Sequence, residues 1–221
     1  MRFENRKEAG IELAEKLERF KGKDAVVLAL PRGGVVVGYE IAKSLNIPLD
    51  IIITRKIGHP RSPEYAICAI AEDGHKLCND KELNNVDKEW FKKECIREQE
   101  EAKRRREIYT KDKREKLGGR TAIIVDDGVA TGLTLRLAIE EVKHEKPKKI
   151  VVAVPVAPRE TAEEVSREVD EFVTLEAPAI YLGAVGAYYR EFDQVGDEEV
   201  ERLLKESELY PERSRRVDGL D

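Results

Sequence analysis

The feature that most constrains the fold is a series of short runs that are apolar at nearly every position. Three of them occupy residues 25–30, 121–125 and 150–156. A strand that is covered on both faces needs apolar side chains on both, and parallel strands are buried in this way. Segments with apolar residues at helical spacing, 35–45 and 134–143, follow two of these runs. Strands that alternate with helices predict an α/β fold, with a mainly parallel sheet flanked by helices.

The remaining elements follow from weaker local signals. Asn5 can cap a first helix, and Pro48 ends the second helix before another apolar strand. Residues 56–63 are rich in glycine and proline, so we expect a loop there. The other elements predicted from the spacing are helices at 5–20 and 159–169 and strands at 49–53, 66–71, 76–78 and 172–174.

A charged segment at residues 84–118 interrupts this pattern. We interpret it as a helical insertion into a single domain that spans residues 1–221. Its apolar residues keep helical spacing only in the first half, so the second half is predicted to be a solvated helix or a mobile arm. The basic run at residues 103–106 could bind an anion or RNA, but acidic residues on both sides favour a solvated helix face.

The composition limits the range of partners. Charged residues make up 38% of the chain, against about 25% in an average domain, and Glu and Lys dominate them as in proteins of thermophiles. The net charge of −5 gives no general attraction for nucleic acid. No apolar run reaches the roughly 20 residues that span a bilayer, and residues 1–10 lack the apolar stretch of a secretory signal. We therefore expect a cytoplasmic protein without nucleic-acid or membrane partners, and a homodimer is compatible with the sequence.

The cysteines bear on the redox compartment. Cys68, Cys78 and Cys95 are odd in number and irregular in spacing, which argues against a disulfide framework. We expect three reduced thiols, as is usual in the cytosol. His75 and Cys78 have a spacing that a zinc ion could use, but two ligands are too few for a structural zinc site.

The strongest chemical signal is the loop at residues 126–134, with the sequence DDGVATGLT. It follows a predicted buried strand and enters a predicted helix, and ligands of open α/β sheets bind at that edge. The first amides of a helix converge on anions, and Gly128 and Gly132 allow a ligand close to the backbone. Asp126 and Asp127 only accept hydrogen bonds, which suits sugar hydroxyls or a hydrated Mg²⁺. One loop therefore offers both parts of a ribose 5-phosphate site.

Other phosphate-binding motifs are absent from the sequence. It contains neither GxxxxGK(S/T) nor a GxGxxG after the first strand. The competing interpretation of residues 126–134 is a strand that merely ends in an acidic turn. Two acids followed by glycine and threonine residues at this spacing favour the ligand site.

The stretch VDDGVATGLT, with the apolar strand before it, resembles the motif that binds phosphoribosyl pyrophosphate (PRPP) in the type I phosphoribosyltransferases. Residues 30–34 (LPRGG) resemble the pyrophosphate loop of the family, and residues 54–56 (TRK) resemble the basic segment ahead of its mobile loop. The resemblance covers residues 24–195. Within the family, the chain is most similar to an uncharacterised prokaryotic group with the PRGG, RKIGHP and AVGAYY stretches.

The resemblance implies a transferase that uses PRPP and Mg²⁺, releases pyrophosphate and transfers the phosphoribosyl group to an unidentified acceptor, a nitrogenous base. Asp126 and Asp127 would hold the ribose hydroxyls and bind Mg²⁺ through water. Arg32 and Lys56 would contact the pyrophosphate, and these four residues are the candidate catalytic residues. The peptide bond between Pro31 and Arg32 would be cis. The implied PRPP-binding residues are Arg32, Gly33, Lys56, Asp126, Asp127, Gly128, Ala130, Thr131, Gly132, Leu133 and Thr134.

Residues 175–195 are predicted to form the hood that contacts the acceptor in this family. Tyr188 or Tyr189 could stack on a flat ring, or both could pack the C-terminal segment onto the core. Ala187 stands where purine-salvage members have an acid that reads the base, so the acceptor stays open. Closure of residues 59–65 would exclude water. Two other functions stay open: a PRPP or nucleotide sensor without catalysis, and a binding module for another phosphorylated sugar.

Overall fold

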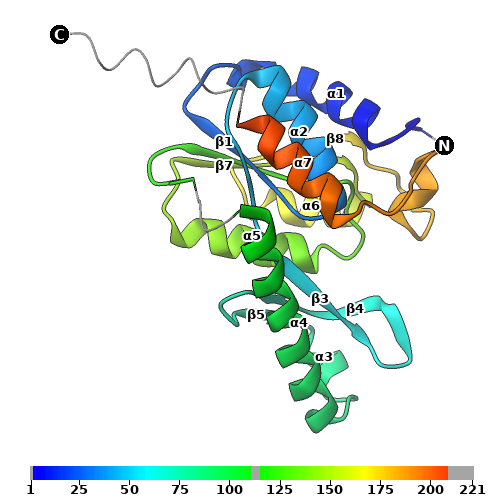
Figure 1. Ribbon diagram of the computed structural model, residues 1–221. Coiled ribbons are helices and arrows are strands. Elements are labelled where there is room, and N and C mark those ends of the chain that lie inside the picture. Colours follow the sequence, from blue (N-terminus) through cyan, green and yellow to red (C-terminus); the bar gives the residue numbers. More distant parts are fainter. Residues whose placement is uncertain (1, 111–114, 209–221) are drawn as a thin grey trace.

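The computed structural model describes residues 2–110 and 115–208, and two sheets organise this part of the chain (Figure 1). The central sheet has five strands in the order β2-β1-β6-β7-β8, and every pair of neighbours is parallel. These strands are β1 (Ala25–Ala29), β2 (Leu49–Ile51), β6 (Thr121–Val125), β7 (Lys149–Val156) and β8 (Glu171–Glu176). The predicted α/β fold with a mainly parallel sheet is confirmed.

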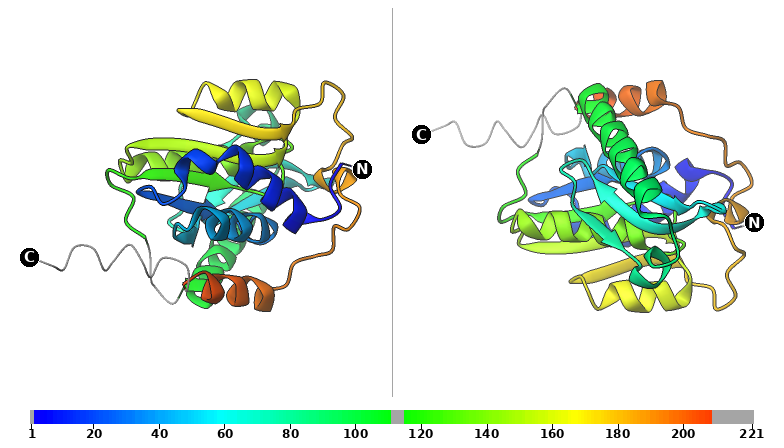
Figure 2. Two further views of the ribbon diagram at one scale, coloured as in Figure 1. Left: turned by 90° about the horizontal axis from the view of Figure 1, so that it is seen from above. Right: turned by 90° about the horizontal axis from the view of Figure 1, so that it is seen from below.

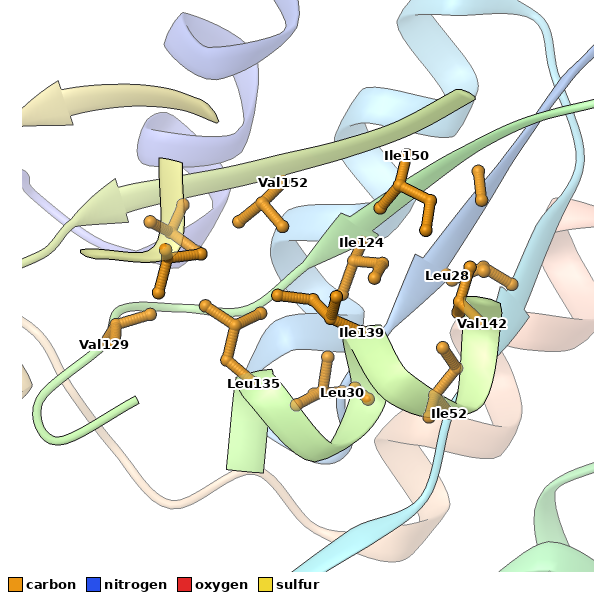
Figure 3. Packing of buried hydrophobic residues seen from close by; sticks show 14 of the residues in the cluster. Leu28, Leu30, Ile52, Ile124, Val129, Leu135, Ile139, Val142, Ile150 and Val152 are labelled. Atoms are coloured by element: carbon orange, nitrogen blue, oxygen red, sulfur yellow. The ribbon is translucent and has the colours of Figure 1, made fainter. Parts of the chain in front are cut away.

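Helices cover both faces of the central sheet (Figure 2). They are α1 (Arg6–Lys16) and α2 (Gly33–Leu45) on one face, α5 (Leu133–His144) and α6 (Arg159–Ser166) on the other, and α7 (Asp197–Ser207) against α2. Val27 and Ile123 pack in a cluster with α1 and α2. Their chain neighbours Leu28 and Ile124 pack under α5 (Figure 3). Successive strand residues point to opposite faces, which is why these strands are apolar throughout.

The ends of these elements follow local signals. α1 begins after Asn5, whose side chain accepts a hydrogen bond from the backbone N–H of Glu8 at 3.0 Å, so the predicted cap is confirmed. α2 ends at Leu45, and the capping residue Asn46 adopts a left-handed φ of 53° ahead of Pro48. Among residues 2–110 and 115–208, no helix has the length and apolar character needed to cross a membrane.

A second, antiparallel sheet follows β2 along the chain. Its three strands are β3 (Thr54–His59), β4 (Ser62–Ala71) and β5 (Lys76–Cys78). The predicted loop at residues 56–63 is therefore wrong, because most of these residues belong to a hairpin. The pairing accommodates glycine and proline through an irregular register on both sides of Gly58. A Cβ atom at Gly58 would lie 2.0 Å from the carbonyl oxygen of Pro63, so glycine is required for this close backbone approach.

A short helix, α3 (Asp80–Leu83), lies just before the charged segment, and a long helix, α4 (Lys88–Thr110), lies within it. The second half of α4 is solvated on one side only, where Lys103, Arg104 and Glu107 are exposed, and its other side packs against the fold. Ala102 is buried, and the side chains of Arg105 and Arg106 are only 11% and 12% exposed. These arginines are buried because acidic partners on α4 and at the end of β4 neutralise them. Part of the predicted arm, residues 111–114, lies outside the described residues.

The three cysteines come together at the second sheet. Cys68 of β4 and Cys78 of β5 form a disulfide, so the expectation of reduced thiols is wrong for these two. They are direct partners in the antiparallel register, with Cα atoms 4.0 Å apart, and their spacing along the chain does not reveal this. Cys95 of α4 packs in the same cluster as a free thiol, and burial raises its pKa. Because its sulfur is in the disulfide, Cys78 cannot form the considered zinc pair with His75.

Candidate functional site

The loop between β6 and α5 lies at the carboxyl edge of the central sheet, as predicted. α5 begins at Leu133, after Gly132 in the left-handed conformation that favours glycine (φ 77°). No side chain of the described structure caps this helix, so its first amides are available to a ligand. Ala130 and Thr131, just ahead of the helix, are exposed to solvent. The structure therefore leaves the predicted anion position accessible.

Two of the predicted loops meet in the structure. Gly33, at the start of α2, is so near Asp127 that a Cβ atom on Gly33 would lie 1.9 Å from Asp127 Oδ2. A Cβ atom on Gly34 would lie 3.0 Å from Asp126 Oδ1. Glycine is needed at both positions because a side chain would displace the acids. The peptide bond Pro31–Arg32 ahead of them is cis, as the resemblance implied.

The two acids are held by hydrogen bonds and mostly shielded from solvent. Asp127 Oδ2 accepts a hydrogen bond from Arg6 Nε at 2.6 Å, between side chains that are 16% and 11% exposed. Asp126 Oδ1 accepts one from the backbone N–H of Asp127 at 2.8 Å, and the Tyr189 hydroxyl donates to the carbonyl of Asp127 at 2.6 Å. Burial, and then the charge of Asp127, raise the pKa of Asp126 well above its usual range. Burial also raises the pKa of Asp127, although Arg6 acts in the opposite direction.

Nothing in the sequence marks Arg6 as a site residue, because its partner Asp127 lies 121 positions away. Its guanidinium carbon lies 3.7 Å from the centre of the Phe192 ring, and its Nη1 donates to the carbonyl of Asp193 at 2.8 Å. Arg6 therefore joins α1, the acidic loop and the segment that precedes α7.

A cavity of about 370 Å³ adjoins these groups. Its lining includes Arg6, Arg32, Gly33, Arg55 and Arg105. None of the described residues that line it carries a carboxylate. Guanidinium groups bind phosphate oxygens through paired hydrogen bonds, so the cavity suits an anion with several oxygens. Of its four arginines, the sequence predicted only Arg32 as a ligand contact.

Lys56 lies on a different face of β3 from Arg55. Its side chain is exposed, and it does not line the cavity. Thr54, two residues earlier, donates from its hydroxyl to the carbonyl of Thr134 in α5 at 3.3 Å. Alternate strand residues share a face, so Lys56 lies on the side of β3 that faces the start of α5.

The predicted hood tyrosines are mostly buried. Tyr188 is 7% exposed, and its hydroxyl accepts a hydrogen bond from the backbone N–H of Leu182 at 3.0 Å. Tyr189 is 2% exposed and stacks on Phe192 with ring centres 4.9 Å apart. These contacts agree with the alternative in which both tyrosines pack the C-terminal segment onto the core. Tyr181 lies in the predicted hood, but no role of its own was predicted from the sequence: its hydroxyl is buried without a hydrogen-bond partner in the described structure, and burial raises its pKa to about 12.

The donor set of the acidic loop fits Mg²⁺ bound through water. Asp126 and Asp127 provide hard carboxylate oxygens, but two residues are too few for an ion without further ligands. Oxygen atoms of a bound phosphate and water would complete the shell. Among the described residues, the one cluster of three candidate metal ligands is Asp73, His75 and Glu141, which joins the β4–β5 turn to α5 and not to this loop.

The model of the phosphoribosyl transferase domain family matches residues 3–190, and the chain belongs to this family. Two curated proteins, from two strains of Mycobacterium tuberculosis and both named "Putative phosphoribosyl transferase", are 40% identical to it over 205 residues. The matches cover 91% of this chain but 46% of each relative, so the chain spans about half the length of these relatives. The crystal structure of TT1426 from Thermus thermophilus is similar throughout, with 40% identity and a TM-score of 0.73 over 93% of this chain and 99% of that one.

Proposed function

We propose that this protein uses PRPP with Mg²⁺, transfers the phosphoribosyl group to a nitrogenous base and releases pyrophosphate. The observation that supports this most is the contact between the acids Asp126 and Asp127 and the glycine loop at residues 32–34. This contact sets acceptors for sugar hydroxyls beside an arginine-lined cavity and an uncapped helix start. Membership of the family supports the reaction class.

Each part of PRPP has a matching group in the proposed complex. The amides of residues 130–134 bind the 5-phosphate at the positive end of α5. Asp126 and Asp127 accept hydrogen bonds from the ribose hydroxyls. An ionised carboxylate has several lone pairs, so Asp127 can keep its bond to Arg6 and still accept a hydroxyl. Arg32 and Gly33 bind the pyrophosphate.

In the transfer, the bond between C1 of the ribose and the pyrophosphate oxygen breaks, and its electron pair leaves with pyrophosphate. The acceptor nitrogen forms the new bond to C1 and gives up its proton to the departing pyrophosphate. Arg32 and Lys56 stabilise the negative charge that gathers on the leaving oxygen. When bound, Mg²⁺ supplies further positive charge to the pyrophosphate. The protein otherwise acts by holding the two reactants in line.

The acceptor site in this proposal lies under residues 175–195. Tyr188 and Tyr189 form its packed base, and the buried hydroxyl of Tyr181, which has no hydrogen-bond partner in the described structure, would pair with a polar atom of the acceptor once this segment opens. The tip of the β3–β4 hairpin, residues 59–65, closes over the reactants and excludes water.

A paired measurement of PRPP affinity and pyrophosphate release tests this function. It compares wild type, Lys56→Ala and, as a control on an exposed face of α4, Lys92→Ala, each with a panel of purines, pyrimidines and small amines. We expect Lys56→Ala to lower turnover by more than it weakens PRPP binding, because only the excess stabilisation of the transition state speeds the reaction. A loss of about 3 kcal/mol would slow the step more than a hundredfold. A wild type that binds PRPP tightly but releases no pyrophosphate with any acceptor would be a sensor instead.

A further inference from the structure

The four arginines of the cavity come from four different parts of the chain, and two of them lie on α4 or contact it directly. Arg105 is itself a residue of α4. Arg55 of β3 donates from Nε to Glu98 of α4 at 2.8 Å, and the Glu98 side chain is only 8% exposed. The long helix of the charged segment therefore forms one wall of the cavity.

Three consecutive arginines of α4 have three different environments. Successive helix residues point about 100° apart around the axis, so neighbours face different surroundings. Arg104 is 46% exposed and pairs with Asp197 at 3.2 Å. Arg106 is mostly buried against β2 and pairs with Glu72 at 3.0 Å. Arg105 alone of the three lines the cavity.

The Arg105 side chain is held on one side, which leaves part of its guanidinium for a ligand. Its Nε donates to Glu101 Oε1 at 2.7 Å, one helical turn earlier. Hydrogen bonds from Arg104 and Arg105 lower the pKa of Glu101 to about 2, so Glu101 stays ionised and keeps this contact at neutral pH. An arginine has five N–H donors, and one contact through Nε uses only one of them.

α4 also holds the arginine of the glycine loop, through α7. Arg32 Nη1 lies 3.6 Å from Asp197 Oδ1. The same carboxylate accepts hydrogen bonds from Tyr109 and Arg104 of α4, and these contacts lower its pKa. Asp197 therefore stays ionised and links Arg32 to the helix.

We propose that Arg105 binds the pyrophosphate end of PRPP directly, so that α4 is a wall of the substrate site, with Glu98 and Asp197 as positioning residues for Arg55 and Arg32. This inference rests on the proposed function. Pyrophosphate carries several negative charges and many oxygens, which matches a cavity whose charged lining residues are all arginines. The guanidinium fork binds two phosphate oxygens at once, a geometry that the ammonium group of lysine does not provide.

Calorimetry with two probes separates this role from a structural one. The probes are inorganic pyrophosphate and ribose 5-phosphate, each with Mg²⁺, because they represent the two ends of PRPP. The variants are Arg105→Met, Arg105→Lys and Lys103→Met, which removes the same charge from an exposed position two residues away. We expect Arg105→Met to weaken pyrophosphate binding about tenfold or more, since a charge-assisted hydrogen bond is lost. Ribose 5-phosphate binding stays within about twofold, Arg105→Lys is intermediate, and Lys103→Met behaves as wild type.

Each contrary result has a distinct meaning. Equal pyrophosphate affinity in wild type and Arg105→Met overturns the inference and leaves the proposed function intact. Equal losses for both probes show that Arg105 only maintains the structure, which also overturns the inference. A wild type that binds neither probe contradicts the proposed function and the inference with it. If Arg105→Met fails to fold in a melting experiment, Arg105→Lys decides: unchanged pyrophosphate binding in that variant rejects the paired contact.

Discussion

The central sheet and the second sheet with α4 are built on different principles. β1, β6 and β7 are covered on both faces, so almost every position is apolar and the pattern is local. The second region buries polar groups as well. Glu98 is buried, and Arg106 donates to Glu72 at the end of β4 and to the carbonyl of Ile51 in β2. Apolar burial can be recognised within a run of five residues, whereas charged burial depends on partners far along the chain.

The largest expected effect is on the stability of the central sheet. Ile124 of β6 is fully buried between its neighbours and α5 (Figure 3). Ile124→Ala should lower the free energy of unfolding by roughly 2–5 kcal/mol, because it removes buried methyl groups and leaves a cavity. Urea denaturation measures this. Ile96→Ala on the exposed side of α4, where the side chain is 50% exposed, is the control and should change stability by less than about 0.5 kcal/mol.

A smaller effect is expected from charged burial in the second region. Arg106→Met should lower the free energy of unfolding by about 1–3 kcal/mol, because Glu72 and the carbonyl of Ile51 lose a donor. The matched variant is Arg97→Met, since Arg97 is 68% exposed and its pairs should contribute only about 0–1 kcal/mol. Equal losses in the free energy of unfolding for the two substitutions would show that the partial burial of Arg106 does not add to stability.

The smallest effect on stability is expected from His75, in the exposed turn between β4 and β5. A hydrogen bond and the charge of Asp73 raise the pKa of His75 above its ordinary value. A raised histidine pKa stabilises the fold below the unfolded-state pKa, and this contribution is lost as the pH rises through the folded-state pKa. An NMR titration of His75 should show the raised pKa, and Asp73→Asn should return it towards about 6.5. An unchanged pKa in Asp73→Asn would exclude the contact in solution.

Much of the parallel sheet and of the acidic loop could be predicted from the sequence, because their signals are local. The runs 121–125 and 150–156 are strands, and residues 126–134 enter a helix where the pattern placed them. The hairpin of β3 and β4 could not be predicted, because the pairing of Gly58 with the backbone of Pro63 overrides the usual preference of both residues for loops.

Three of the four arginines that line the cavity could not be predicted either, because their positions depend on contacts that are distant in the sequence. Arg6 contacts Asp127 across 121 positions, and Arg105 belongs to a basic run whose local surroundings indicate solvent. Which of three neighbouring arginines faces the cavity depends on how α4 is rotated against β3 and α7, and that rotation is a property of the tertiary packing. Lys56 and the hood tyrosines remain predictions as ligand contacts.

The measurement that tests the central claim most directly is calorimetry of PRPP binding to wild type and to the double variant Asp126→Asn, Asp127→Asn, with and without Mg²⁺. Asparagine keeps the shape of both side chains and removes their charges, and a melting curve confirms that the variant is folded. The wild type should bind PRPP more tightly with Mg²⁺. The double variant should bind about tenfold or more weakly, with little response to Mg²⁺, because charged acceptors for the ribose hydroxyls and the hydrated ion are lost. Unchanged PRPP affinity and unchanged Mg²⁺ dependence in a folded double variant would contradict the assignment of this loop as the PRPP site.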